Sequence, residues 1–160
     1  MKKNIVFVIC MLVLVSISSC RISKKAAYFD FETTCLNTEG DGSLTLRVWG
    51  EGRNAFDAAE QAKKNAVYDV LFKGITKGLQ GYQSRPLVPE VNARQKYMDY
   101  FDNFFKDGGA YIEFVSLNDR RLGTSEFRRK AGDQVKWATT IRVLVPQLRQ
   151  RMKDDGILQN

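Results

Sequence analysis

The sequence contains no histidine, and it has only three cysteines and three prolines among its 160 residues. The absence of histidine removes the commonest general base and the commonest ligand of transition metals. It also excludes every nucleophile that depends on a neighbouring imidazole, the Ser-His and Cys-His pairs included. The composition therefore argues against the usual hydrolase centres, and we expect neither a metal site nor a cofactor.

The amino terminus, MKKNIVFVICMLVLVSISSC, has the pattern of a secretory signal. Lys2 and Lys3 precede an apolar run at 5–15, and small residues lead to Cys20. The run is shorter than the roughly 20 apolar residues that a membrane-spanning helix needs. Residues 17–20 resemble the bacterial lipobox, in which signal peptidase cuts just before the cysteine and the cysteine is then acylated.

This resemblance divides the chain into a removed signal peptide (1–19), a lipidated tether (20–27) and a single domain (28–160). Removing 19 of the 160 residues leaves 141, with 23 basic and 18 acidic side chains and a net charge of +5. Each buried methylene contributes about 0.8 kcal/mol, so several acyl chains on Cys20 would hold the protein firmly on a membrane.

The residues next to Cys20 also indicate which membrane carries the protein. Ile22 stands second after the cysteine, where an aspartate would favour retention at the inner membrane. We therefore expect an outer-membrane lipoprotein that faces the periplasm, with surface display as the alternative. That compartment, together with the mixture of both charge signs along the chain, argues against a nucleic-acid partner.

The cysteines provide no intramolecular disulfide. Cys10 leaves with the signal peptide and Cys20 carries lipid, which leaves Cys35 alone. We expect Cys35 to be a buried, inert thiol in a β-rich segment, and pairing between two molecules is the alternative.

The hydrophobic periodicity predicts an α+β domain with the order β-β-α-α-β-β-β-α. The expected strands are 28–36, 43–49, 110–117, 125–131 and 134–145, and the expected helices are 54–73, 90–106 and 146–156. Between the first two helices, residues 74–89 form the longest irregular stretch. Such an order indicates a mainly antiparallel sheet with helices packed on one face.

A glycine-containing segment follows the second expected strand. Gly50, Gly52 and Ala55 match the G-x-G-x-x-A spacing of dinucleotide-binding folds. Those folds require a parallel strand soon after the helix, whereas this helix is followed by glycines and prolines. We therefore expect a structural turn, with Asn54 as the helix N-cap and no bound nucleotide. Arg53 at the helix start is a weaker candidate for an anion contact.

The helix after this segment has two distinct sides. Small and branched apolar residues recur at helical spacing on its inner face: Ala55, Ala59, Ala62, Ala66, Val67, Val70 and Leu71. Polar residues are expected on the opposite, solvated side: Glu60, Lys63, Lys64 and Asp69. The small inner side chains predict a helix that lies close to the sheet.

The second expected helix is unusually aromatic. Tyr97, Tyr100, Phe101 and Phe104 are candidates for a protein-binding surface, because the aromatic residues span more than one buried stripe needs. The alternative is that they fill the core. Acidic pairs such as Asp99 with Asp102, and the acidic turn at 39–42, lack the context of a catalytic pair or an EF-hand.

Three segments, LTLRVWGEG, AFDAAEQAKKNAVYDVLF and WATTIRVLVPQLRQRM, together resemble a known family. They are similar to small outer-membrane lipoproteins that share a domain with the N-terminal domain of the flagellar ring protein FlgT. The likeness covers about residues 28–157. It implies a non-enzymatic α+β module of envelope assemblies, without catalytic residues to transfer.

Together these observations predict a lipid-anchored periplasmic module with a binding or assembly role in a cell-envelope complex. Its partner would be another envelope protein or a further copy of the chain. The alternative is a lipoprotein that binds or processes envelope glycans. That alternative would use the aromatic helix at 90–106, with Asp99 or Asp102 beside the rings.

Overall fold

The computed structural model describes residues 31–117, 128–131 and 134–158. The expected signal peptide, the tether and Cys20 lie outside the described residues, as does the first part of the strand expected at 28–36. Within the described ranges, no helix is both long and apolar enough to cross a bilayer.

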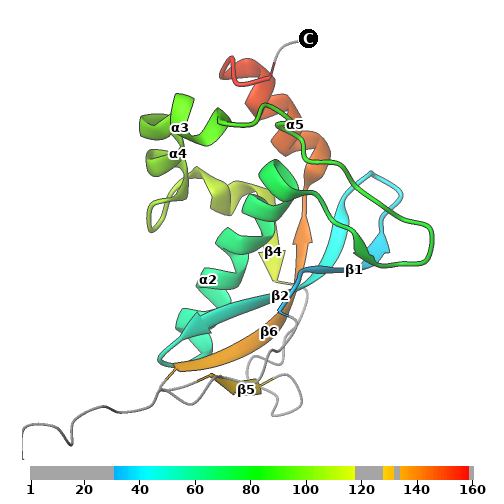
Figure 1. Ribbon diagram of the computed structural model, residues 1–160, viewed down its shortest axis with the longest axis vertical. Coiled ribbons are helices and arrows are strands. Elements are labelled where there is room, and N and C mark those ends of the chain that lie inside the picture. The colour runs from blue at the N-terminus through cyan, green and yellow to red at the C-terminus, as the bar shows by residue number, and fades with distance from the viewer. Residues whose placement is uncertain (1–30, 118–127, 132–133, 159–160) are drawn as a thin grey trace, which may run out of the picture.

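The fold is α+β, as predicted, and it is built on a six-stranded, mostly antiparallel sheet (Figure 1). The strands are β1 (Thr34–Thr38), β2 (Leu44–Gly52), β3 (Lys77–Gly78), β4 (Val115–Leu117), β5 (Arg128–Ala131) and β6 (Gln134–Val143). Their order is β3-β1-β2-β6-β4, and β5 pairs with the other part of β6. Only the β1–β3 pairing is parallel among those described.

The long antiparallel pair β2–β6 forms the centre of the sheet. Its register runs from Leu44 opposite Val143 to Gly52 opposite Val135. The alternation predicted for both strands is confirmed, because one face of each is buried. On β2 this face carries Leu44, Leu46 and Val48, and on β6 it carries Trp137, Thr139, Ile141 and Val143.

Helices cover one face and one end of this sheet. They are α2 (Ala55–Tyr68), its π-helical continuation η1 (Asp69–Lys73), α3 (Ala93–Lys96), α4 (Met98–Phe105), the 3₁₀ helix η2 (Ala110–Phe114) and α5 (Val145–Asp154). The helix α2 packs on β2 and β6, while α3, α4 and α5 gather at the end away from the β5–β6 hairpin (Figure 1).

The start of α2 follows the predicted capping chemistry. The Asn54 side chain accepts hydrogen bonds from the backbone N–H groups of Phe56 and Asp57, each at 2.9 Å. An N-cap of this kind satisfies donors that the first helical turn leaves without partners. The prediction that α2 begins at Asn54 is confirmed.

The expected glycine turn is wrong, because Gly50 and Gly52 belong to strand β2. Both glycines face the helix at very short range. A Cβ added to Gly50 would lie 1.7 Å from the Ala58 carbonyl oxygen, and one added to Gly52 would lie 2.6 Å from the Ala58 nitrogen. The glycines therefore permit the close contact between α2 and β2 that the alanine face also requires.

The segment expected as a strand at 110–117 is the 3₁₀ helix η2 followed by the short strand β4. Tyr111 and Phe114 are both buried. Residues three apart share one side of a 3₁₀ helix, so this local structure buries both rings. The helix expected at 90–106 is also divided, with Tyr97 between α3 and α4.

The irregular stretch expected at 74–89 contains the two-residue strand β3, which pairs with β1. Gly78 adopts a φ of 120°, and a Cβ there would lie 1.9 Å from the Cys35 carbonyl oxygen. Glycine is thus required for this pairing. Cys35 itself is buried in β1, as predicted, and burial raises the pKa of its thiol above the usual value.

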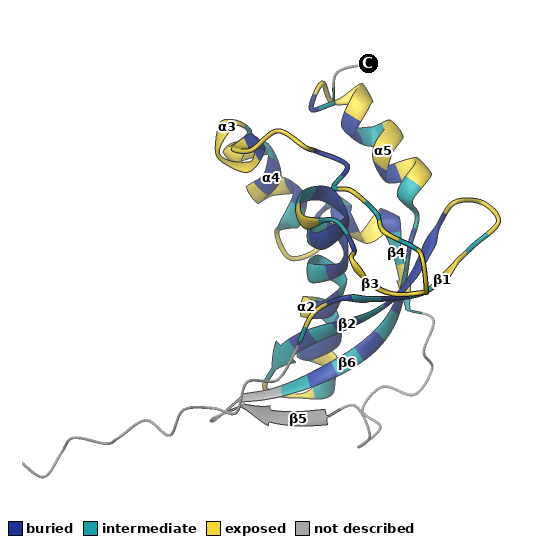
Figure 2. Ribbon diagram, turned by 45° about the vertical axis from the view of Figure 1, so that its right-hand side comes forward, coloured by how far each residue is buried: buried dark blue, intermediate teal, exposed yellow. Residues whose placement is uncertain are grey.

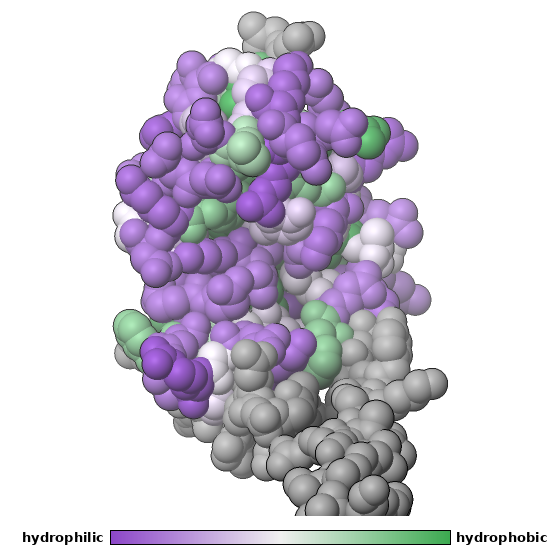
Figure 3. Space-filling view, turned by 60° about the vertical axis from the view of Figure 1, so that its left-hand side comes forward, coloured by the Kyte–Doolittle hydropathy of each residue, from purple (hydrophilic) through white to green (hydrophobic). Residues whose placement is uncertain are grey.

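The core lies between α2 and the sheet and extends beneath α4 and α5 (Figure 2). Exposed residues are concentrated on α3, on the outer side of α5 and in the segment around β3. The face shown in Figure 3 is mostly hydrophilic, with hydrophobic side chains in small separate patches.

Candidate functional site

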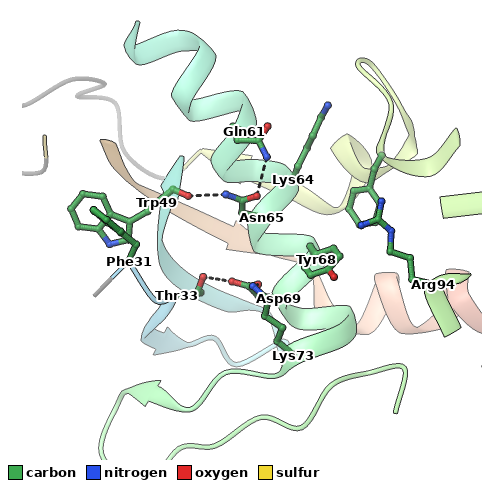
Figure 4. A pocket seen from close by; sticks show the side chains of 11 residues that line it. Phe31, Thr33, Trp49, Gln61, Lys64, Asn65, Tyr68, Asp69, Lys73 and Arg94 are labelled. Atoms are coloured by element: carbon green, nitrogen blue, oxygen red, sulfur yellow. Dashed lines mark hydrogen bonds and ion pairs between the residues drawn. The ribbon is translucent and has the colours of Figure 1, made fainter. Parts of the chain in front are cut away.

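A cavity of about 440 Å³ opens along α2 and η1. Side chains from three parts of the chain form its walls (Figure 4). One wall comes from the residues before β1 and from β2, the floor comes from α2 and η1, and the opposite wall comes from α3 and α4. This volume falls within the range of small-molecule and peptide side-chain pockets.

The first wall is held to the helix by a chain of hydrogen bonds. Phe31 packs edge-on against Trp49, with 5.2 Å between ring centroids. Asn65 Nδ2 donates to the Trp49 carbonyl oxygen at 2.9 Å, and Gln61 Nε2 donates to Asn65 Oδ1 at 3.0 Å (Figure 4). These bonds fix the end of β2 against the exposed side of α2.

Asp69 carries the buried charge of the site. It is only 8% exposed, so the prediction that it lies on the solvated side of the helix is wrong. The Thr33 hydroxyl donates to Asp69 Oδ2, and Lys73 Nζ lies 2.9 Å from Oδ1. A buried carboxylate needs such partners, because an unpaired one is strongly destabilising. The π-helical turn that begins at Asp69 places Lys73 in this position.

The Tyr68 ring lies close to two cations. Lys73 Nζ is 5.4 Å from the centroid of its ring, and Arg94 Cζ is 5.6 Å from it. Both distances are within the range of favourable cation–π contacts. Phe72 packs beside the same ring at 5.0 Å. Both cations thus lie against the Tyr68 ring, which itself packs on Phe72.

The lining of this cavity is positively charged overall. Lys64, Lys73 and Arg94 line it, whereas Asp69 is its one acidic lining residue. Lys64 Nζ forms an ion pair with Asp107 at 2.6 Å, and Arg94 forms a longer one with Asp102 at 3.7 Å. Lys73 pairs with Asp69, so each of the three cations has a carboxylate partner.

A second cavity, of about 800 Å³, lies on the other side of the Tyr68–Arg94 pair. Both of these residues line both cavities. Its remaining lining is mixed. The apolar part comes from Phe72, Pro86, Val88, Pro89, Val91 and Met98, and the polar part comes from Glu90, Asn92, Gln95 and Asp102. Val91 and Met98 are 86% and 56% exposed.

The aromatic residues predicted as a partner surface divide into two pairs. Phe101 and Phe104 are buried in the core, so the expectation that they face a partner is wrong for these two. Tyr97 and Tyr100 are half-buried and pack against the same core. The expected helix is divided at Tyr97, and in α4 Phe101 packs against Phe72 while Phe104 packs against Phe114.

Tyr100 has a polar partner at the edge of the core. Its hydroxyl donates to Asp155 Oδ2 at 2.5 Å, and Arg151 Nε lies 2.6 Å from the same oxygen. Burial, followed by the hydrogen bond to Asp155, raises the pKa of the Tyr100 hydroxyl well above its usual range. Burial opposes ionisation of Asp155, but the bonds from Tyr100 and Arg151 lower its carboxyl pKa below the usual value.

Of the other predicted residues, Arg53 and Asp99 line neither cavity. Arg53 is almost fully exposed, pairs with Asp57 at 3.3 Å and lines neither cavity. Asp102 lines the second cavity, whereas Asp99 does not. Across the described ranges, no group of three or more acidic or cysteine side chains could hold a metal ion.

Sequence reasoning missed Trp49, Tyr68 and Arg94 as site residues. A signal for the floor was present, because Gln61, Asn65 and Tyr68 recur at helical spacing beside the alanine face. No protein-family model, no curated protein and no solved structure matches the chain. Its function is therefore inferred from its own residues.

Proposed function

We propose that this protein is a lipid-anchored module of the bacterial envelope that binds a protein partner and catalyses no reaction. The observation that supports binding most directly is the pair of cavities that meet at Tyr68 and Arg94. The anchor rests on the sequence before Cys20, which resembles the lipobox. The expected address is the periplasmic side of the outer membrane.

The position of the first cavity fits an anchored module. Phe31 and Thr33 line it, and only residues 21–30 separate Phe31 from Cys20. At about 3.5 Å per residue, this length of chain spans at most roughly 40 Å. A partner bound in the cavity would therefore be held close to the membrane surface.

The resemblance to the N-terminal domain of FlgT supports a role in an assembly. The segments that carry it correspond to β2, α2, β6 and α5, which build the central part of this fold. In this proposal the module contributes an anchored binding surface to a larger envelope complex, either with another protein or with copies of itself.

The rival proposal is a glycan-binding or glycan-processing lipoprotein that uses residues 90–106. It depends on exposed aromatic faces, since sugars stack on such faces. Phe101 and Phe104 are buried, which leaves the half-buried Tyr97 and Tyr100 on that helix. Protein binding therefore has the stronger support.

In-cell crosslinking followed by purification of the tagged protein tests the binding role. We expect one or a few envelope proteins, or a ladder of the chain itself, to be recovered reproducibly. The Cys20→Ser variant is the control, because it removes the anchor and leaves the domain intact. A protein recovered as a monomer without a reproducible partner would contradict the proposal.

A further inference from the structure

The net charge of the chain from Cys20 onward is concentrated in two short segments. Residues 21–30 include three basic residues and one acidic residue, and the segment 128–137, RRKAGDQVKW, includes four basic residues and one acidic residue. The remainder of the chain after Cys20 contains sixteen basic and sixteen acidic residues. These two segments therefore supply the whole net charge of +5.

The segment 128–137 forms the β5–β6 hairpin, at the end of the sheet away from α3, α4 and α5 (Figure 1). Arg128, Arg129 and Lys130 are consecutive on β5. They stand in register with β6 residues 135–137, none of which is acidic. Among the described strands β5 pairs with β6 alone, so these three basic residues lie along an edge of the sheet.

The described part of the chain begins beside this hairpin. Phe31 is its first residue, and Lys136 Nζ of β6 lies 4.3 Å from the centroid of the Phe31 ring. Lys136 also pairs with Glu51 at 3.3 Å, so the excess positive charge of the hairpin belongs to β5. Residues 21–30 join Phe31 to Cys20 and span at most roughly 40 Å, which keeps the hairpin near a membrane that holds an acylated Cys20.

We propose that the β5–β6 hairpin contacts the membrane and that its basic residues bind the anionic headgroups of phospholipids around the anchor. Each basic residue close to an anionic membrane strengthens binding by about fivefold, and this attraction decays within a Debye length. The anchor keeps the hairpin within reach of such a short-range attraction. The contact directs α3, α4 and α5 away from the bilayer. This inference rests on the proposed lipid anchor and adds the surface through which the domain meets the membrane.

Basic residues on an edge strand can also serve a different purpose, because charge there discourages pairing with the strands of other molecules. Glutamates would provide that protection as well, whereas anionic headgroups would repel them. Reversal of the charge on β5 therefore separates lipid binding from protection of the edge.

The fluorescence of the two tryptophans of the chain measures the contact. Both lie at this end of the sheet, since Trp137 stands opposite Arg128 and Trp49 packs against Phe31. The full-length acylated protein is reconstituted into phosphatidylcholine vesicles with or without phosphatidylglycerol, and a spin label on the headgroup of a tracer lipid serves as the quencher. We expect stronger quenching with phosphatidylglycerol. Salt at about 1 M should abolish the difference, because the Debye length then falls to about 3 Å.

Two matched variants locate the effect. The test variant reverses the charge of β5 by three substitutions: Arg128→Glu, Arg129→Glu and Lys130→Glu. The control makes the same change of net charge at exposed positions of α3 and α5: Lys96→Glu, Arg149→Glu and Lys153→Glu. The test variant should lose the quenching that depends on phosphatidylglycerol, and the control should keep most of it. Thermal unfolding shows whether each variant retains the fold, and if the test variant does not, the wild-type comparison of lipids and salt still decides.

Equal quenching of the wild type in both kinds of vesicle would overturn the inference, as would equal behaviour of the folded test variant and the control. Mass spectrometry of the purified protein distinguishes this failure from failure of the proposed function. A chain without an acylated Cys20 would remove the anchor and the inference together. An acylated protein that recovers a partner in cells, but shows no added quenching with phosphatidylglycerol, would leave the proposed function standing and refute the hairpin contact.

Discussion

Gly50 of β2 lies directly against the backbone of Ala58 in α2, so closely that a Cβ on the glycine would stand 1.7 Å from the Ala58 carbonyl oxygen. The contact sets the distance between the helix and the central strand. The hydrogen bond from Asn65 to the Trp49 carbonyl oxygen is made one residue away along β2. The part of β2 that packs so closely on α2 therefore also forms a wall of the first cavity.

Replacement of Gly50 by alanine should destabilise the protein strongly. A methyl group on Gly50 would overlap backbone atoms of α2, and these atoms cannot move unless the helix shifts. We expect the free energy of unfolding to fall by about 3 kcal/mol. Gly40→Ala is the matched control, because a Cβ there has nothing within 4 Å. Equal urea midpoints for the two variants would contradict the close contact.

Asn54→Ala should lower the free energy of unfolding by about 1 kcal/mol, since it removes the cap on two backbone N–H groups. Asn92 occupies the same position at the start of α3, but its side chain makes no cap hydrogen bond. Asn92→Ala should therefore change stability much less. Urea unfolding of both variants measures the difference, and an equal loss in both would refute the capping role of Asn54.

Thr33→Val should also be costly, because it removes the hydroxyl that donates to the buried Asp69 carboxylate. Leaving a buried acceptor without this partner is expected to lower the free energy of unfolding by about 1–3 kcal/mol. Thr76→Val provides the comparison, because the Thr76 hydroxyl donates to Glu32 at the exposed surface. Chemical denaturation should show a clear loss for the first variant and little for the second.

The Tyr100–Asp155 pair predicts a pH dependence of stability. At pH 7, Tyr100→Phe should lower the free energy of unfolding by about 1 kcal/mol through loss of the hydrogen bond. The pKa of Tyr100 is raised in the folded state, so its contribution is complete below the unfolded value of about 10 and is lost as pH rises beyond it. The difference between wild type and Tyr100→Phe should therefore shrink above pH 10.

At low pH the Asp155 carboxyl of the same pair changes stability in the opposite direction. The pKa of Asp155 is lowered in the folded state, so its contribution is present above about pH 4 and is lost as pH falls below that value. The difference between wild type and Tyr100→Phe should narrow there as well. Urea titrations at pH 3, 7 and 10.5 measure both limits. A difference that stays constant across them would rule out this linkage.

The sequence predicted the central elements well, because their signals are local. Alternation identified β2 and β6, and the cap residue located the start of α2. Gly50 and Gly52 were misassigned to a turn, since a glycine marks either a turn or a close approach of two backbones. Only the folded chain, with Ala58 against Gly50, decides between these two meanings.

The segment 110–117 carries a spacing signal that its β-like composition hides. As a strand it would place Glu113 on the same face as Tyr111, whereas the structure buries Tyr111 and Phe114 together. Residues three apart share one side of a 3₁₀ turn, so this spacing fits helical structure better than a strand. The β3–β1 pairing gave no comparable signal, because it involves two residues and a distant strand.

The two cavities were largely beyond prediction from the sequence. Their components lie far apart in the chain, and the Thr33–Asp69 contact spans 36 residues. Tyr68 was visible on one side of α2, but nothing local indicates that Arg94 lies over its ring. Such contacts arise from tertiary packing, which places α3 beside the end of α2.

The proposed place of this module in the envelope depends most directly on its lipid anchor, which metabolic labelling with palmitate tests. We expect the wild-type protein and Cys35→Ser to incorporate label and to fractionate with the outer membrane. Cys20→Ser should lose the label and leave the membrane fraction. Label that persists in Cys20→Ser would contradict the anchor and, with it, the proposed place of this module in the envelope.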